Sequence, residues 1–246
     1  METVLTVLAL AAFILVVVAA TTVTETLAQR NLRMEPFEDD GSVMAARLFR
    51  AMEPFHQWAE QNGFAFAGCY LVKMGSHKAF ISAWCHVDRP TLLCRYSIPL
   101  SRPSQGGTDI ATDFADDVSL TSCDVKGGLF NPKPPKHYHQ GFAGLTLDEL
   151  WSRHVEMEDY LMDVGGARLV SRQIDFANGF VDACRKENQY IRSLPLWFLR
   201  GPYWFFVRQN LLHNKSIRQQ HEKGMIKLPN ELKQVKPPQL PNNRKA

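Results

Sequence analysis

Residues 64–98, FAFAGCYLVKMGSHKAFISAWCHVDRPTLLCRYSI, decide the fold of this 246-residue chain. The stretch holds three runs rich in aromatic and β-branched residues, at 64–74, 79–87 and 91–98, and short polar turns separate them. Turns this short exclude parallel crossovers, which need about a dozen residues or more. The stretch therefore predicts an antiparallel β-meander.

Two further strand-like runs continue the meander. They lie at residues 109–114 and 118–123, and Asp116-Asp117 between them is typical of a tight turn, because an Asp side chain bonds the backbone two residues on. We therefore expect four to five strands. Residues 126–144, with three prolines and a pair of glycines, predict a loop.

A helix is expected before the meander. Apolar residues recur at three and four positions from Val43 to about Gln61, and Gly63 provides a stop. Pro54 lies inside this pattern, and an interior proline removes a backbone hydrogen bond. We therefore expect the helix to kink or split near Ala51.

Helical patterns return after the meander. Thr146 and Glu149 have capping-box spacing, and Gly165-Gly166 ends the pattern. A second amphipathic pattern covers residues 171–192. The predicted fold class is α+β: an N-terminal transmembrane helix, then an antiparallel meander packed with helices on one face, with residues 43–192 as the globular domain.

The N-terminus predicts a membrane anchor, which we place at residues 1–28. Twenty-two uncharged residues separate Glu2 from Glu25. At roughly 1.5 Å per helical residue they reach about 33 Å, enough to cross a hydrocarbon layer of about 30 Å. Residues 29–42 are polar and acidic and predict a juxtamembrane linker.

A cleaved signal peptide is the competing interpretation of this stretch. Val18, Ala19 and Ala20 are small enough for a cleavage site. However, no Lys or Arg precedes the apolar run, and the run is longer than the usual apolar region of about 7–15 residues. The sequence therefore favours a retained single-pass anchor.

Orientation follows from the charges beside the anchor. Arg30 and Arg33 flank its C-terminal end and no basic residue flanks the other, so the positive-inside rule places the bulk of the chain in the cytoplasm. Five cysteines without a C-x-x-C pair agree with free thiols in a reducing compartment. The composition, 45% hydrophobic and 22% charged, excludes a collagen-like or wholly disordered chain.

Charge is distributed unevenly along the chain. Residues 1–184 carry a net charge of −7 and residues 185–246 carry +10. For a chain held at a bilayer, the lipid bilayer itself, with its anionic headgroups, or another membrane protein is the expected partner of the basic part. The sequence favours such a partner over a nucleic acid.

Residues 194–212, LPLWFLRGPYWFFVRQNLL, form what we call the aromatic segment, the centre of an aromatic and basic amphipathic region at 193–222. Arg200 at its middle and the helix-breaking Gly201-Pro202 disfavour a second membrane span. Either its aromatic rings lie at headgroup depth or they pack into the soluble core. The candidate membrane-interface residues are Trp197, Phe198, Arg200, Tyr203, Trp204, Phe205, Phe206 and Arg208. Residues 223–246, rich in Pro and Lys, predict a disordered tail.

One weak metal-site candidate lies in the predicted loop. His137 and His139 are two residues apart, and His154 or Asp148 could supply a third ligand. His154 falls within an apolar helical stripe, which favours a hydrogen-bonded core histidine. We therefore expect neither a metal site nor a cofactor.

No other pattern in the sequence indicates catalysis. A group of acids suits turns better than acid/base chemistry, and the cysteines lack a neighbouring base. No Walker loop, G-x-S-x-G, G-x-G-x-x-G or H-E-x-x-H motif occurs. The grouped acids are Asp109, Asp113, Asp116, Asp117 and Asp124.

Three functional hypotheses follow. The first, which the sequence favours, is a non-enzymatic binding or scaffolding module at the cytoplasmic membrane surface. The second is a membrane-anchored, metal-dependent hydrolase that uses His137, His139 and the acids near Asp117. The third is a binder of a small apolar ligand in a cleft lined by Phe64, Phe66 and Trp84.

Overall fold

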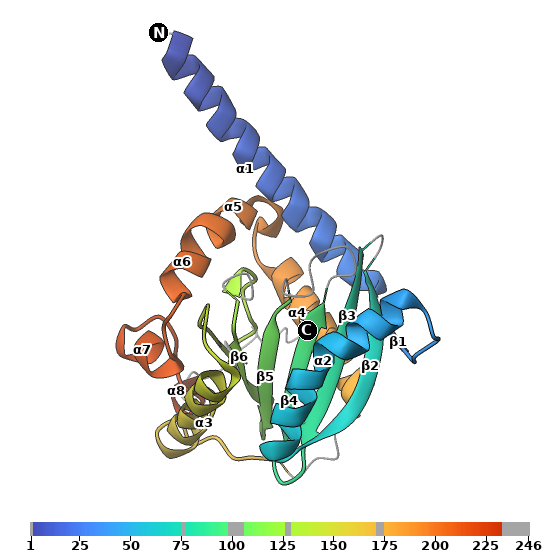
Figure 1. Cartoon of the computed structure of the whole chain (residues 1–246). Helices are drawn as coiled ribbons and strands as arrows, with labels where there is room; N and C mark the ends of the chain where they lie inside the picture. The colour runs from blue at the N-terminus through green and yellow to red at the C-terminus, as the bar shows by residue number, and fades with distance from the viewer. Residues whose placement is uncertain (1, 75–76, 98–105, 126–128, 171–174, 233–246) are drawn as a thin grey trace, which may run out of the picture.

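A seven-stranded sheet forms the centre of the computed structural model, which describes residues 2–74, 77–97, 106–125, 129–170 and 175–232 (Figure 1). Its strands lie side by side in chain order. They are β1 (Arg33–Pro36), β2 (Phe64–Met74), β3 (His77–His86), β4 (Thr91–Ser97), β5 (Thr108–Phe114), β6 (Val118–Cys123) and β7 (His137–Gly141).

The described residues also form four longer helices and several short ones. The longer ones are α1 (Glu2–Ala28), α2 (Val43–Gln61), α3 (Leu147–Asp163) and α4 (Phe176–Ser193). The short ones are α5 (Gly201–Tyr203), α6 (Gln209–Leu212), α7 (Ile217–Glu222) and α8 (Pro229–Leu232). Tight turns of 3₁₀ helix occupy Gln29–Asn31 and Trp197–Leu199, and a π-helical turn occupies Trp204–Arg208.

The predicted antiparallel meander is confirmed from β2 to β6. β1 adds an antiparallel strand beside β2, and β7 adds a parallel strand beside β6. Asp116 and Asp117 both have φ near +60°, which is the geometry of a tight hairpin turn, so the predicted turn is also confirmed. The residues between β6 and β7 are long enough for a parallel crossover.

The predicted count of four to five strands is wrong, because β1 and β7 were not expected. β1 lies inside the predicted linker at 29–42; it is short and ends in a proline, so no strand pattern marks it. Pairing with β2 holds it, and Lys73 Nζ lies 2.5 Å from Glu35 Oε2. β7 lies in the predicted 126–144 loop, and its sequence, HYHQG, is polar apart from Tyr138.

Helices cover both faces of the sheet, not one face as predicted. α2 and α3 pack on one face around Phe64, Trp84 and Leu93, in front of the sheet in Figure 1. α4 packs on the other face through Phe176, against Ile81 and other residues of β2 to β4. The reason lies in β3, whose successive residues are apolar on both sides, as in strands buried on two faces.

The predicted helix boundaries fit the observed ones. Ser42 caps α2, which ends before Gly63, and the chain there takes φ +78°. α2 runs unbroken through Pro54, so the proline does not split it. The capping box between Thr146 and Glu149 is present at the start of α3. α4 begins at Asp175, its N-cap; the first predicted residues, 171–174, lie outside the described part.

The start of the predicted disordered tail is folded. Leu228 is buried in a cluster with Met157 and Leu161 of α3, and α8 follows it. Asn230 Nδ2 donates to the carbonyl oxygen of Val164, which ties α8 to the end of α3. Residues 233–246 of the predicted tail lie outside the described residues.

Candidate membrane interface

One helix within the described residues is long and apolar enough to cross a membrane. It covers Thr3–Asn31; the most apolar window of this helix has a mean hydropathy of 2.8, and the domain buries none of that window. A signal sequence has the same properties, so the helix is a candidate anchor or signal. Figure 1 shows α1 projecting away from the rest of the protein.

Only the C-terminal part of α1 is docked on the domain. Thr22 is 2% exposed and Thr26 is 3% exposed, whereas the apolar side chains from Val4 to Val17 are open to solvent. The Asn188 side chain, from α4, donates to the carbonyl oxygen of Thr26. This hydrogen bond joins residues 162 positions apart.

Gly201 allows the aromatic segment to approach α1 closely. A Cβ at this position would lie 2.3 Å from Thr22 Oγ1 and 3.3 Å from the Val18 carbonyl oxygen. Atoms cannot pack at 2.3 Å, so only glycine fits this contact without movement. In the sequence, Gly201 followed by Pro202 predicts a helix break. A glycine among large aromatic residues also indicates a site of close contact.

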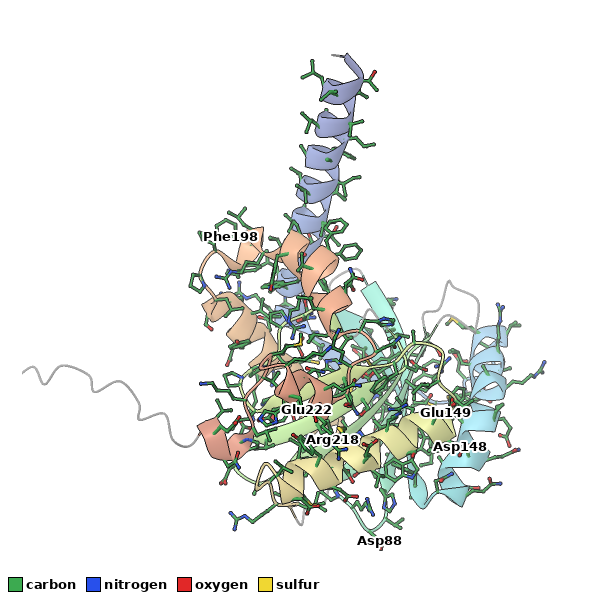
Figure 2. The ribbon with its side chains drawn as sticks, turned by 90° about the vertical axis from the view of Figure 1, so that its left-hand side faces the viewer. Asp88, Asp148, Glu149, Phe198, Arg218 and Glu222 are labelled. Carbon is green, nitrogen blue, oxygen red and sulfur yellow. The ribbon has the colours of Figure 1, made fainter. Side chains whose placement is uncertain are left out.

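The candidate interface residues divide into outward and inward groups. Figure 2 shows Phe198 near the level at which α1 leaves the domain, while Asp88 and Asp148 lie at the opposite end. Trp204 is 2% exposed and packs edge-on against Phe130. Arg208 donates to the carbonyl oxygens of Leu129 and Asn131, at 2.6 and 3.1 Å. Trp197 is half-buried, and the outward group consists of Phe198, Arg200, Tyr203, Phe205 and Phe206.

The three candidate metal-binding histidines do not converge. His139 pairs with Thr121 in the sheet and, with His137, points to the α4 face, because alternate strand residues share a face. His154 points to the other face from α3, where its ring bonds Thr112 and Ser122. In the described part of the chain no three His, Cys, Asp or Glu residues could hold a metal ion together.

His154 belongs to a buried polar network, as a hydrogen-bonded core histidine would. Glu158, fully buried one turn along α3, accepts from Thr91 and bonds Arg89 Nη1 at 3.0 Å. Burial alone would raise the pKa of Glu158, but hydrogen bonds from His154 and Thr112 outweigh it and hold the pKa below its ordinary value. This network ties α3 to β4 and β5, and no local sequence pattern indicates it.

The α4 face of the sheet also carries ionisable groups that are partly or fully buried. Burial raises the pKa of Asp109 to about 6, although Lys133 and a hydrogen bond from the Tyr96 hydroxyl oppose the rise. Lys133 Nζ is 2.6 Å from Glu187 Oε2 on α4. His139 is buried and, among the described residues, neither of its ring nitrogens has a hydrogen-bond partner. Burial therefore lowers its pKa and keeps the ring neutral.

The remaining chemical candidates have structural roles. Asp117 bonds Lys186 at 2.6 Å, and Asp124 Oδ1 accepts from the Thr108 amide at 2.7 Å. Asp148 Oδ1, in the first turn of α3, accepts from the Trp58 indole at 2.8 Å. All five cysteines are free, and burial raises the pKa of Cys123 far above that of a reactive thiol.

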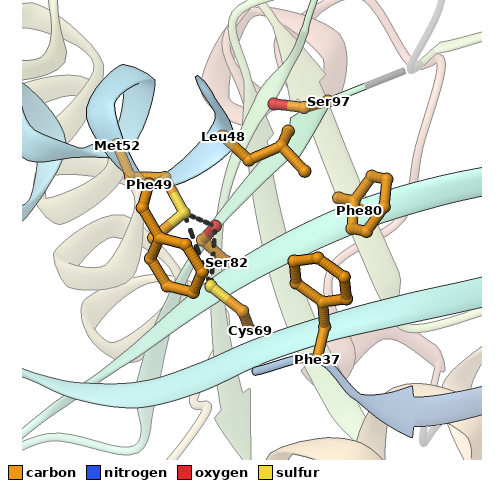
Figure 3. A pocket seen from close by; sticks show the side chains of 8 residues that line it. All are labelled: Phe37, Leu48, Phe49, Met52, Cys69, Phe80, Ser82 and Ser97. Carbon is orange, nitrogen blue, oxygen red and sulfur yellow. Dashed lines mark hydrogen bonds between the residues drawn. The ribbon is translucent and has the colours of Figure 1, made fainter. Parts of the chain in front are cut away.

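The predicted apolar cleft is filled. Phe64 and Trp84 are packed into the core, and only Phe66 is exposed. A different hollow lies between α2 and the sheet, with the Met52, Cys69 and Ser82 side chains in mutual contact at its floor (Figure 3). The cavity volume is about 10 Å³, about the space that one water molecule needs, so the hollow does not hold a ligand as it stands.

Comparisons of the chain with protein-family models, with curated protein sequences and with solved structures give no significant match.

Proposed function

We propose that this protein is a membrane-anchored, non-enzymatic binding or scaffolding module whose α+β domain sits on the membrane surface. The observation that carries the proposal is the position of the exposed aromatic residues beside the point where α1 leaves the domain. Monomeric soluble proteins rarely expose large contiguous apolar patches. A bilayer around α1 would cover the apolar surface of α1 and that of the exposed aromatic residues at the same time.

Cytoplasmic orientation is part of the proposal. Arg30 and Arg33, which follow α1, are exposed at the domain end of the span. Exposed basic residues at this position can contact phosphate groups of the leaflet, and the positive-inside rule assigns them to the cytoplasmic side.

The buried networks support a binding role over catalysis. Glu158 and His154 are enclosed between α3 and the sheet and have protein partners. His137 Nδ1 bonds Ser119 at 3.1 Å, and His154 is on the opposite face, so the hydrolase alternative lacks its third ligand. No observation favours that alternative or the small-ligand alternative.

Alkaline carbonate extraction of membranes that contain the full-length chain tests the anchor. We expect the chain to stay in the membrane pellet and its N-terminus to precede Thr21. Leu10→Arg with Phe13→Arg should release it, because each central Arg costs about 2.5–3.5 kcal/mol on insertion. Val43→Arg, at an exposed position of α2, is the matched control and should leave the chain in the membrane pellet.

Two results would reject the proposal. One is extraction of the intact chain by carbonate, or a mature N-terminus near Thr21. The other is stoichiometric metal in the purified protein, lost in His139→Ala, which would instead support the hydrolase.

A further inference from the structure

We propose that residues 196–211 lie within the acyl-chain layer of the proximal leaflet, beside the lower part of α1, and not only at headgroup depth. The inference rests on the proposed membrane anchor and adds to it the depth at which the aromatic segment sits. The partner is thus the hydrocarbon of one leaflet, and the domain is held by one spanning helix and one half-immersed element.

The length of the exposed apolar part of α1 indicates how deep the aromatic segment lies. Its freely exposed apolar part, residues 4–17, is about 21 Å long as a helix. A hydrocarbon layer of about 30 Å is longer than this by about 9 Å. The missing length corresponds to residues 18–23, and Gly201 packs against Val18 and Thr22 there. If α1 spans the membrane, α5 therefore lies at the depth of the hydrocarbon layer. A tilted α1 covers less of the membrane thickness, so a tilt places α5 still deeper.

The outward surface of residues 196–211 has the chemistry of a lipid contact. Leu196 is 62% exposed and Phe198 is 45% exposed. Arg200 is the exposed charge in this stretch, and its long side chain can extend toward the phosphates. No acidic residue occurs from 188 to 221. The outward apolar residues are Leu196, Phe198, Leu199, Phe205, Phe206, Val207 and Leu211.

Several polar side chains at this level have hydrogen-bond partners within the protein, which favours their transfer into a layer without water. Asn210 Nδ2 donates to the Phe206 carbonyl oxygen at 2.8 Å, and Gln209 donates to that of Phe205. Arg208 is bonded to two carbonyl oxygens below the segment. On α1, the Thr21 hydroxyl donates to the Val17 carbonyl oxygen at 2.9 Å. These bonds lower the cost of transferring side-chain groups out of water.

Photocrosslinking from lipids measures this depth directly. The full-length chain is reconstituted in vesicles of phosphatidylcholine and phosphatidylserine that carry a diazirine either in the middle of an acyl chain or on the headgroup. Trypsin cleaves after Arg192, Arg200 and Arg208, so the labelled peptides resolve the segment. The peptide that ends at Arg30 reports α1, and the peptide at 154–168, from α3, is the internal negative control.

We expect the acyl probe to label peptides 193–200 and 201–208 within about threefold of the α1 peptide, and at least about tenfold more than the α3 peptide, since hydrocarbon contact is confined to one layer. Phe205→Asp with Phe206→Asp should reduce the labelling of 201–208 while the α1 peptide stays labelled.

The outcomes separate this inference from the proposed function. Acyl labelling of α1 with only headgroup labelling of 193–208 would overturn the immersion and leave the anchor intact. If the acyl probe labels α1 but neither probe labels residues 193–208, then protein, not lipid, covers the segment. Absence of acyl labelling on α1 itself would overturn the anchor.

Discussion

Gly201→Ala tests the contact on which the depth argument depends. The added methyl group would lie 2.3 Å from Thr22 Oγ1 and 2.9 Å from Thr22 Cβ. Since carbon atoms pack at about 3.5–4.0 Å, α1 and α5 must separate by about 1 Å. Overpacking of this kind costs about 1–3 kcal/mol. For a chain of this size the midpoint of thermal unfolding should fall by about 2–4 °C per kcal/mol. Tryptophan fluorescence of the full chain in nanodiscs measures it.

Gly179→Ala is the matched control. Gly179 lies inside α4, and a Cβ there meets nothing within 4 Å. Alanine is favoured over glycine in a helix interior by about 0.5–1 kcal/mol, so this variant should unfold at the wild-type temperature or slightly higher. Thr22→Gly removes the atoms nearest to the added methyl group and should partly rescue Gly201→Ala. An unfolding midpoint of Gly201→Ala equal to that of the wild type would refute the close packing of α1 and α5.

Three further predictions concern the domain. Glu158→Gln should lower the free energy of unfolding in urea by about 1–3 kcal/mol at pH 7, because it weakens the bonds of a buried carboxylate to Arg89 and Thr91. The pKa of Glu158 is lower in the folded chain than the ordinary value of 4.5. Below pH 4.5 the carboxylate of the unfolded chain protonates first, so this difference in the free energy of unfolding should shrink as the pH falls further. Asp109→Asn should become more stable relative to the wild type as the pH rises from about 4 to about 6, by up to about 3 kcal/mol, because desolvation disfavours ionised Asp109. Urea titrations across this pH range measure the difference in the free energy of unfolding. A difference that stays constant with pH would contradict the prediction. Thr146→Ala should cost about 1 kcal/mol in the same assay, because it removes the cap of α3, whereas no change would mean that the box contributes nothing.

Much of the sheet could be predicted because its strands carry their own pattern. Residues 64–74 and 118–123 were placed as strands with the observed bounds, and the turn at Asp116-Asp117 follows from its residue types. β1 and β7 could not be predicted in this way, because their strand state comes from pairing with a neighbour formed elsewhere in the chain. The helix on the second face follows from the two-sided burial of β3, which short apolar runs do not distinguish from one-sided burial.

The candidate site could be predicted in composition but not in orientation. The sequence marks residues 194–212 as aromatic and broken by Gly201, yet nothing local tells that Trp204 turns inward while Phe205 and Phe206 turn outward. Trp204 packs against Phe130, which lies 74 positions earlier, and such a distant contact has no local sequence pattern. His154 was correctly interpreted as a core residue, while Arg89, its indirect partner through Glu158, carries no local pattern.

The contact between Thr26 and Asn188 sets an order of events during synthesis. α1 leaves the ribosome first, but the α4 residue that binds its end follows 162 positions later. At about 5–20 residues per second, that interval is on the order of 10–30 s. Throughout it, the apolar helix has no docking surface of its own chain. If α1 is the proposed membrane anchor, its insertion precedes the domain, and the domain completes its fold against a helix that is already in place.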